Sequence, residues 1–297
     1  MRGAIAIGSN STRMLAAQKR QGKLCGLLRG REETKLFLGL DEAGNILPER
    51  IENTAQAVNR LYRQAVSSGA ESVALFATSA MRDAKNGNLL DARIRELCGL
   101  GVQVISGEEE ARLAFAAASG GGSRLVIDIG GGSTEFTVGN QGKVQWAGSA
   151  QMGASRLMRM RPIHSVSDAE AAFLIARNTL RPFAEQINAL PKADGMTGLG
   201  GSCTTAAAML LGREAHGEEI EGYTVTLHDA WAQLHMLSGM TMEERWQVPG
   251  LPRSRAEHMP NGLCILAAAM ELCGFDQLTV SIRTNLDGYL LSLPDEQ

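Results

Sequence analysis

The sequence lacks the features that mark several large classes of protein. Its net charge is only −3, so it has no strong positive field that would attract nucleic acid or an anionic membrane surface. No segment approaches the roughly 20 consecutive apolar residues that span a bilayer. The opening MRGAIAIGSNSTR becomes polar too soon for a signal peptide. We therefore expect no nucleic-acid partner and no membrane association, and an anionic ligand would have to be bound by local donors.

Cysteine is also sparse, and its pattern excludes two kinds of site. The five cysteines are scattered, no two form a CxxC pair, and no spacing of cysteine and histidine suggests zinc. Because their number is odd, they cannot all pair within the chain. Reduced thiols, and hence a cytoplasmic protein, are the expectation.

What is present is an alternation of strand-like and helix-like segments, which is typical of an α/β protein. The chain of 297 residues is long enough for two domains of ordinary size. We expect strands near residues 4–7, 14–17, 72–77, 102–105, 125–129, 135–138, 144–149 and 195–197. We expect helices near residues 48–67, 88–98, 108–118, 167–188, 204–211, 227–238, 241–247 and 260–273.

A glycine-rich joint divides the chain. The segment SGGGS at residues 119–123 separates an alanine-rich helix from the strand that begins at Arg124. We expect an N-terminal domain over residues 1–119, a C-terminal domain over residues 123–297, and a hinge at about 119–123, since a few small residues can absorb large backbone rotations.

Each of these halves begins with a similar motif. IAIGSNSTR at residues 5–13 aligns with IDIGGGSTE at residues 127–135, so that Gly8 matches Gly130 and Ser11 matches Ser133. Each copy predicts a strand, a tight turn and a returning strand, which is a hairpin. The pattern therefore predicts two similar domains that each bring a glycine hairpin to a shared cleft; the alternative is two unrelated hairpins.

The second turn has the chemistry of a phosphate site. Glycine lets backbone N–H groups approach a ligand closely, and a row of such groups binds anions. Gly130, Gly131 and Gly132 would supply the N–H groups, and Ser133 would add a hydroxyl. A structural hairpin turn is the alternative, although three glycines exceed what such a turn requires.

Two carboxylates flank this turn. Asp128 ends a buried apolar run, where an ionised carboxylate is costly unless it is paired or bound to metal. Glu135 lies on the returning strand and can face the same side. Hard oxygen ligands beside phosphate suit Mg²⁺. The alternatives are an aspartate that caps the turn and a glutamate on the strand surface.

A run of acids opens a predicted helix. Glu108, Glu109 and Glu110 follow a strand and a Ser-Gly pair. Acids complement the dipole of a helix in its first turn, yet one of them could also act as a general base toward water. Upstream, Arg82 follows another strand and is either a phosphate clamp or a solvated arginine.

Two further segments have less specific signals. In GLGGSCTT, Gly201 and Ser202 precede an alanine-rich helix, with Ser202 as its predicted N-cap, and would form a second anion site or an ordinary capped helix. In RLMRMR, which begins at Arg156, the arginines either extend a basic track or form a solvated face.

Taken together, these motifs resemble the exopolyphosphatase / guanosine pentaphosphate phosphohydrolase family in its short two-domain form. The resemblance covers nearly the whole chain in order, from near residue 5 to near residue 291. The matching segments are IGSNSTRML, ATSAMRDAKN, VISGEEEARL, LVIDIGGGSTEF, SAQMGASRL, GLGGSCTT, VPGLPRSRAEHMPNG and LDGYLL. The combination of DIGGGSTE with GEEEARL is the specific part.

The resemblance implies two ribonuclease-H-like domains of the actin and Hsp70 (ASKHA) superfamily around a cleft. It implies a hydrolase that releases terminal phosphate from polyphosphate with Mg²⁺, or alternatively from guanosine pentaphosphate. By this similarity Glu110 corresponds to the general base, and Asp128 and Glu135 to metal-associated carboxylates. The positions that correspond to phosphate contacts are Asn10, Ser11, Arg82, Gly130, Gly131, Gly132 and Ser133.

The sequence departs from the family at two acidic positions. Ala6 stands where the first strand of the family has aspartate, and Ile282 follows Ser281 where the family has a Ser-Asp pair. These losses support a third hypothesis, a polyphosphate or guanosine polyphosphate sensor without turnover, and they predict a weakened enzyme if there is one. A homodimer is also expected, with Trp146 and the apolar segment 262–273 either at its interface or in the core.

Overall fold

The chain forms two compact units. The computed structural model describes residues 1–118, 120–215 and 217–296. Unit 1 comprises Met1–Ala117 with Thr284–Gln297, and unit 2 comprises Ala118–Arg283. The predicted hinge begins at residue 119, which lies outside the described residues. The chain therefore passes between the units twice, near residues 117 and 284, whereas the sequence analysis predicted a single joint at 119–123.

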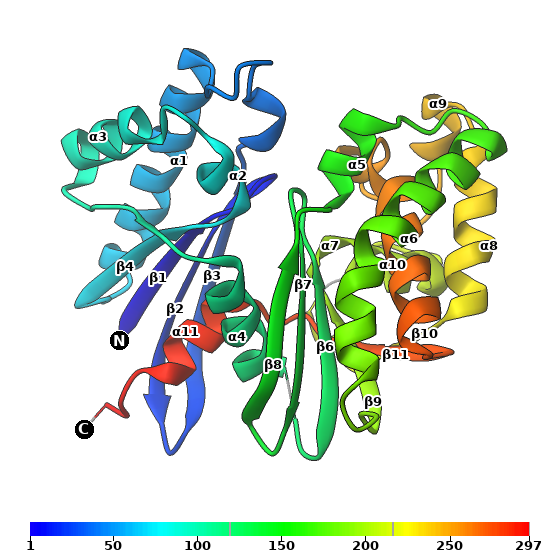
Figure 1. Ribbon diagram of the computed structural model, residues 1–297. Coiled ribbons are helices and arrows are strands. Elements are labelled where there is room, and N and C mark those ends of the chain that lie inside the picture. Colours follow the sequence, from blue (N-terminus) through cyan, green and yellow to red (C-terminus); the bar gives the residue numbers. More distant parts are fainter. Residues whose placement is uncertain (119, 216, 297) are drawn as a thin grey trace. The chain divides into compact units, whose positions relative to one another are not determined.

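Unit 1 is built on a five-stranded sheet in the order β3-β2-β1-β4-β5 (Figure 1). The first strand pairs antiparallel with the second and parallel with the fourth. The strands are β1 (Arg2–Ile7), β2 (Ser11–Arg20), β3 (Lys23–Glu33), β4 (Ser72–Ala77) and β5 (Gln103–Val104). The helices are η1 (Phe37–Gly39), α1 (Pro48–Ser67), α2 (Ser79–Asp83), α3 (Gly87–Cys98), α4 (Gly107–Ala118) and α11 (Asn285–Ser292).

Helices cover both faces of this sheet. Successive side chains of a strand point to opposite faces, and those of β1 are apolar on both, so each face needs a covering layer. Ile5 and Ile7 pack in one apolar cluster with buried residues of α1 and α3. Ala4 and Ala6 pack on the other face with Leu286 of α11. Ala4 and Ala6 are small, so Leu286 and Leu290 of the short C-terminal helix can pack over β1 on this face.

The position of α11 corrects the predicted domain boundary, which assigned residues 284–297 to the C-terminal domain. Asp287 is only 2% exposed and accepts two hydrogen bonds from the Arg29 guanidinium of β3, at 2.6 and 3.1 Å. It also closes a capping box with Thr284 at the start of the helix. Gly288 packs so closely on Leu113 of α4 that a β-carbon would overlap the Leu113 backbone. The sequence could not show this, because both partners lie far away along the chain.

This partly buried ion pair leads to a stability prediction. We expect Asp287→Ala to destabilise unit 1 by about 1–3 kcal/mol, since it removes the capping box of α11 and two charge-assisted hydrogen bonds, while the Arg29 side chain, 40% exposed, stays solvated. All three tryptophans lie in unit 2. Urea unfolding followed by far-UV circular dichroism should therefore show the shift more strongly than tryptophan fluorescence does. Asp295→Ala, which removes a more exposed C-terminal carboxylate, is the control, and equal midpoints for the two variants would contradict the assignment.

Unit 2 is built on a six-stranded sheet in the order β10-β11-β9-β6-β7-β8 (Figure 1). Its strands are β6 (Ser123–Ile129), β7 (Thr134–Asn140), β8 (Lys143–Ala150), β9 (Gly195–Leu199), β10 (Thr224–Thr226) and β11 (Gln277–Val280). Its α-helices are α5 (Ala154–Met160), α6 (Val166–Asn188), α7 (Gly200–Leu211), α8 (Leu227–Ser238), α9 (Met242–Arg245) and α10 (Met259–Cys273). The described part of the unit also contains the 3-10 helices η2 (Gly217–Glu219) and η3 (Arg253–Arg255).

The core of unit 2 lies between this sheet and a layer of helices. Ile127 and Ile129 of β6 pack in one cluster with α6, α7, α8 and α10. The apolar segment 262–273 belongs to α10 and is mostly buried in this core. Trp146 packs on Phe183 and donates a hydrogen bond to Gln186 at 3.0 Å. Trp146 and the segment 262–273, which were the candidates for a dimer interface, thus pack within unit 2. The homodimer stays a prediction.

The α/β alternation is confirmed, and the strands that were not predicted are mainly edge or short ones. The sequence of β3, KLCGLLRGREE, is mostly exposed and rich in charge, as is common for an edge strand that must avoid pairing with other chains. β10 and β11 have only 3 and 4 residues. Among the described residues, the helices are all too short or too polar to cross a membrane.

Candidate functional site

The two predicted hairpins have the same local geometry. In unit 1 the N–H of Gly8 donates to the carbonyl of Ser11 at 3.1 Å, and in unit 2 the N–H of Gly130 donates to the carbonyl of Ser133 at 3.0 Å. In each case the first strand also pairs parallel with a later strand, β1 with β4 and β6 with β9. The repeat therefore extends from the motif to the topology, and the alternative of two unrelated hairpins is excluded.

Helix α5 binds the carbonyl side of the unit 2 turn. The N–H of Ala154 donates to the Gly130 carbonyl at 2.9 Å, and the N–H groups of Ser155 and Arg156 donate to the Gly131 carbonyl at 2.9 and 3.0 Å. The Arg156 Nε–H donates to the Gly132 carbonyl at 2.6 Å. In a planar trans peptide the C=O and N–H groups point in opposite directions. The N–H groups of residues 131–133 are therefore directed away from α5, as an anion site requires.

A neighbouring glycine allows this close approach. A β-carbon at Gly153 would overlap the backbone of Gly131 and Gly132. The motif SAQMGASRL, which begins at Ser149, thus contains both this glycine and the first turn of α5, the helix that holds the glycine turn of unit 2.

The unit 1 turn is held in a similar way. The Ser9 carbonyl accepts a hydrogen bond from the Phe37 N–H at 2.9 Å, and the Asn10 carbonyl accepts from the N–H groups of Thr34 and Lys35 at 3.2 and 3.0 Å. The N–H groups of residues 10 and 11 therefore point away from this segment. The Ser11 hydroxyl accepts a hydrogen bond from Arg31 at 3.1 Å. Asn10 and Ser11 lie where a second anion site is expected.

The two carboxylates of unit 2 lie side by side. Asp128 and Glu135 are direct partners across the antiparallel β6–β7 pair, which places their β-carbons about 4.5–5.5 Å apart on one face. Glu135 is 2% exposed, and its Oε1 accepts a hydrogen bond from the Ser149 hydroxyl at 2.7 Å. The prediction that both carboxylates share one side of the turn is confirmed by this register.

The N-terminus of α7 completes the surroundings of Asp128. Gly200 has a φ of +83°, and a β-carbon there would lie 2.5 Å from Asp128 Oδ1 and 2.6 Å from the Ile129 carbonyl oxygen. Only glycine suits this position, because it tolerates the left-handed backbone and leaves room for the carboxylate. The partial positive charge of a helix N-terminus favours an anion beside it. Burial raises the pKa of the Cys203 thiol in the next turn, and the charge of Asp128 raises it further.

Two predictions about this helix need revision. α7 begins at Gly200 with Leu199 at its N-cap, so Ser202 is not the cap, because the helix starts four residues before the predicted residue 204. The Ser202 hydroxyl packs against Gly262 of α10. Gly201 leaves space for the guanidinium of Arg255, which lies directly over it. A cation beside an anion-attracting helix end suits an anion site, and sequence analysis missed Arg255 because it lies far along the chain.

In unit 1 the structure distinguishes between the three adjacent glutamates. Glu110 is 7% exposed, whereas Glu108 and Glu109 are exposed. The first turn of α4 is capped by Ser106, whose hydroxyl accepts from the Glu109 N–H at 3.1 Å. Of the three glutamates, the buried Glu110 is therefore the one best suited to act as a general base.

Arg82 binds Glu110. Its guanidinium Nη1 donates to Glu110 Oε2 and to the Ile105 carbonyl oxygen, both at 3.0 Å. The solvated alternative for Arg82 is therefore excluded, since its side chain is only 18% exposed. The arginine orients the carboxylate in this structure, and direct contact of Arg82 with phosphate stays a prediction.

Ala6 and Ile282, the two positions where the sequence lacks the acid of the family, have different surroundings in the structure. Ala6 is paired across the strands with Arg13, at the place that Asp128 and Glu135 occupy in unit 2. At the second position, the Ile282 N–H and the Ser281 hydroxyl both donate to the Glu221 carboxylate, at 2.7 and 3.0 Å. A carboxylate is thus present beside Ser281, but it comes from elsewhere in the chain.

The donor set fits magnesium better than zinc. Asp128 and Glu135 offer hard oxygen ligands, and Mg²⁺ is commonly bound by one or two carboxylates together with substrate phosphates and water. Within the described part of the chain there is no cluster of three or more histidine, cysteine, aspartate or glutamate side chains that could bind a metal ion alone. A metal held by Asp128 and Glu135 would accordingly depend on the substrate.

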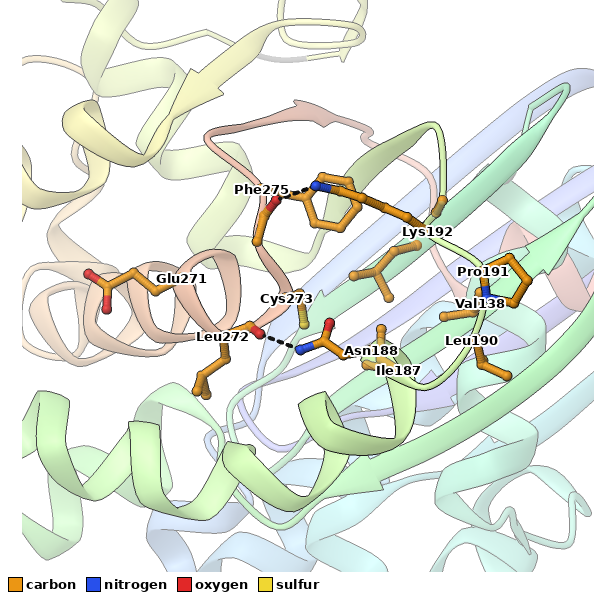
Figure 2. A pocket seen from close by; sticks show the side chains of 13 residues that line it. Val138, Ile187, Asn188, Leu190, Pro191, Lys192, Glu271, Leu272, Cys273 and Phe275 are labelled. Carbon is orange, nitrogen blue, oxygen red and sulfur yellow. Dashed lines mark hydrogen bonds between the residues drawn. The ribbon is translucent and has the colours of Figure 1, made fainter.

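A cavity of about 280 Å³ in unit 2 lies away from these motifs (Figure 2). Its walls include Leu125 near the start of β6, at the opposite end of the strand from the glycine turn, and the C-terminal ends of α6 and α10. Lys192 donates to the Gly274 carbonyl at 3.1 Å, and Asn188 donates to the Leu272 carbonyl at 2.8 Å. These polar side chains cap the end of α10, so the cavity is a gap between helix ends.

Comparison with known proteins then decides the family. The model of the Ppx/GppA phosphatase family matches residues 15–296. The chain belongs to the Ppx/GppA phosphatase family. Exopolyphosphatase 2 of Mycobacterium tuberculosis is 32% identical over 98% of this chain and 97% of its own length.

Solved structures of this family agree in fold. The Ppx/GppA enzyme of Aquifex aeolicus has 28% identity and a TM-score of 0.82, with 98% of each chain covered. An exopolyphosphatase from Cytophaga hutchinsonii has 25% identity and a TM-score of 0.87, with 97% of this chain and 96% of that chain covered. The chain is thus a phosphatase-family protein with the actin-like, two-domain ASKHA fold, as the sequence motifs predicted. The roles of individual residues stay predictions.

Proposed function

We propose that this Ppx/GppA family protein is an exopolyphosphatase that releases the terminal phosphate of inorganic polyphosphate. The observation that carries the proposal is the glycine turn of unit 2, where the N–H groups of residues 131–133 are directed away from α5 in a hairpin that also carries Asp128 and Glu135. Polyphosphate is a chain of anions, and the turn has no side chains that would select a base or a sugar. The names of the exopolyphosphatase relatives support the same substrate class.

Each group then has a role in phosphoryl transfer. The N–H groups of residues 131–133 stabilise negative charge on the transferred group, as preorganised donors do in other phosphoryl-transfer sites. Glu110, oriented by Arg82, accepts a proton from the attacking water. The water oxygen forms a bond to the terminal phosphorus while the bond from that phosphorus to the bridging oxygen breaks. Orthophosphate and a polyphosphate chain one unit shorter are the products.

Magnesium is the proposed cofactor, held by Asp128 and Glu135. When bound, it would neutralise charge on the phosphate oxygens. The Ser149 hydroxyl, which donates to Glu135, would orient that ligand.

One assay tests the proposed function against both alternatives. Phosphate release is measured from tripolyphosphate, from long-chain polyphosphate and from guanosine pentaphosphate, each with Mg²⁺ and with a chelator. We expect release from polyphosphate that requires Mg²⁺. A higher kcat/KM on guanosine pentaphosphate would favour the nucleotide as substrate. Binding of polyphosphate without release would favour the sensor hypothesis, which the residues at Ala6 and Ile282 motivate.

A further inference from the structure

The glycine turn of unit 2 cannot select its own orientation. Glycine adopts left-handed and right-handed backbone conformations about equally well, and the turn has three glycines in succession. If one peptide rotated by half a turn, it would present a carbonyl oxygen instead of an N–H group to the anion. Contacts from outside the turn must therefore maintain the binding orientation.

Most of these contacts come from backbone groups, but one comes from a side chain. Backbone N–H groups of α5 hold the carbonyls of Gly130 and Gly131, whereas the Gly132 carbonyl accepts from the Arg156 Nε–H at 2.6 Å. The Nη2 of the same guanidinium donates to Gln151 Oε1 at 3.2 Å. The hydrogen bond from Arg156 to Gly132 is short and has a charged donor, and such a bond is stronger than a hydrogen bond between two neutral groups.

Unit 1 provides an internal comparison. Asn10 occupies the position equivalent to Gly132, and its carbonyl accepts from the backbone N–H groups of Thr34 and Lys35. Substitution cannot remove these backbone donors. In unit 2 the same carbonyl depends on a side chain, so a single substitution can release the last peptide of the turn.

We propose that Arg156 is a positioning residue, which sets the orientation of the Gly132–Ser133 peptide so that the Ser133 N–H faces the anion. The proposal rests on the proposed function and deepens it, because it names what holds the phosphate site ready. It also assigns a use to the first arginine of RLMRMR, whose guanidinium is bound to the turn rather than spread over a basic face.

Lysine cannot replace arginine in this role. The guanidinium donates from two nitrogens, Nε and Nη2, held in a fixed planar fork, whereas the ammonium of lysine is a point charge on a flexible stem. A role that required only positive charge near the phosphate would be preserved in Arg156→Lys. A positioning role would be lost in both Arg156→Lys and Arg156→Ala.

The kinetic test compares these two variants with Arg181→Lys and Arg181→Ala, which change an exposed arginine of α6 in the same unit. We expect kcat/KM for polyphosphate to fall on the order of 10²-fold in both Arg156 variants and to stay unchanged in both controls. Added guanidinium ion should restore part of the activity of Arg156→Ala. Wild-type kinetics in Arg156→Lys, or no recovery with guanidinium, would overturn the proposal.

A crystal structure of Arg156→Ala separates failure of this inference from failure of the proposed function. We expect the Gly132–Ser133 peptide to be rotated while α5 and the Gly130 and Gly131 contacts are retained. If the wild-type protein released no phosphate from polyphosphate but the peptide still rotated in the variant, only the proposed function would fail. An unchanged peptide in the variant would refute the positioning role, whatever the activity.

Discussion

Replacement of Glu110 by glutamine should lower the kcat for release of terminal phosphate by about 10²–10⁴-fold, the range that a general base usually contributes. Glutamine has nearly the same shape and can still accept a hydrogen bond from Arg82, so the local packing should survive. What is lost is the ability to take a proton from water. The rate is measured as phosphate released from tripolyphosphate at saturating Mg²⁺.

Glu109→Gln provides a matched control. It removes the same charge from the same turn of α4, but the Glu109 side chain is exposed. Any general effect of charge on substrate attraction or helix stability should appear in both variants. Equal rates in Glu109→Gln and Glu110→Gln would show that Glu110 is not the base.

Asp128→Asn should have the second large effect, on the dependence of activity on metal. We expect the Mg²⁺ concentration for half-maximal activity to rise by at least about 10–100-fold, which is the loss seen when even supporting groups of a metal site are changed. Asparagine keeps the size of the side chain beside Gly200 but loses the negative charge that attracts Mg²⁺. Activity is measured over a range of Mg²⁺ at fixed polyphosphate.

The control for this variant is Glu185→Gln, an exposed carboxylate of α6 in the same unit. If the loss in Asp128→Asn were caused by unfolding, excess Mg²⁺ would not restore activity. Recovery at high Mg²⁺ supports a metal-binding role, and an unchanged Mg²⁺ profile would exclude Asp128 as a ligand.

The hairpin geometry could be predicted because it is local. The turn is closed by a hydrogen bond between residues three apart, Gly8 with Ser11 and Gly130 with Ser133. The residues that favour such a turn are therefore adjacent in the sequence, and the repeat displays them twice. The pairing of Asp128 with Glu135 follows from the same short hairpin.

The choice among the three acids at 108–110 could not be made from local pattern alone. All three occupy the first turn of one helix, and each could complement its dipole. Successive residues of a helix point about 100° apart, so only the packing of α4 decides which one is buried. The family resemblance identified Glu110, and its burial beside Arg82 agrees with that choice.

The unpredicted parts of the site depend on contacts between distant segments. Arg156 reaches the Gly132 carbonyl across 24 residues of sequence. Arg255 lies over Gly201 although more than fifty residues separate them. An arginine in a loop or a short helix has the same local pattern whether it binds a backbone carbonyl or water.

By itself the sequence determined the α/β class, the repeated hairpin, the family and the acids that flank the second turn, because these features are encoded by residue types at short spacing. The tertiary structure alone decided the return of α11 to unit 1, the burial of Glu110 and the direction of the N–H groups in the glycine turn. Those depend on which distant segments pack together. A flexible glycine peptide in particular takes its orientation from its partners and not from its own side chains.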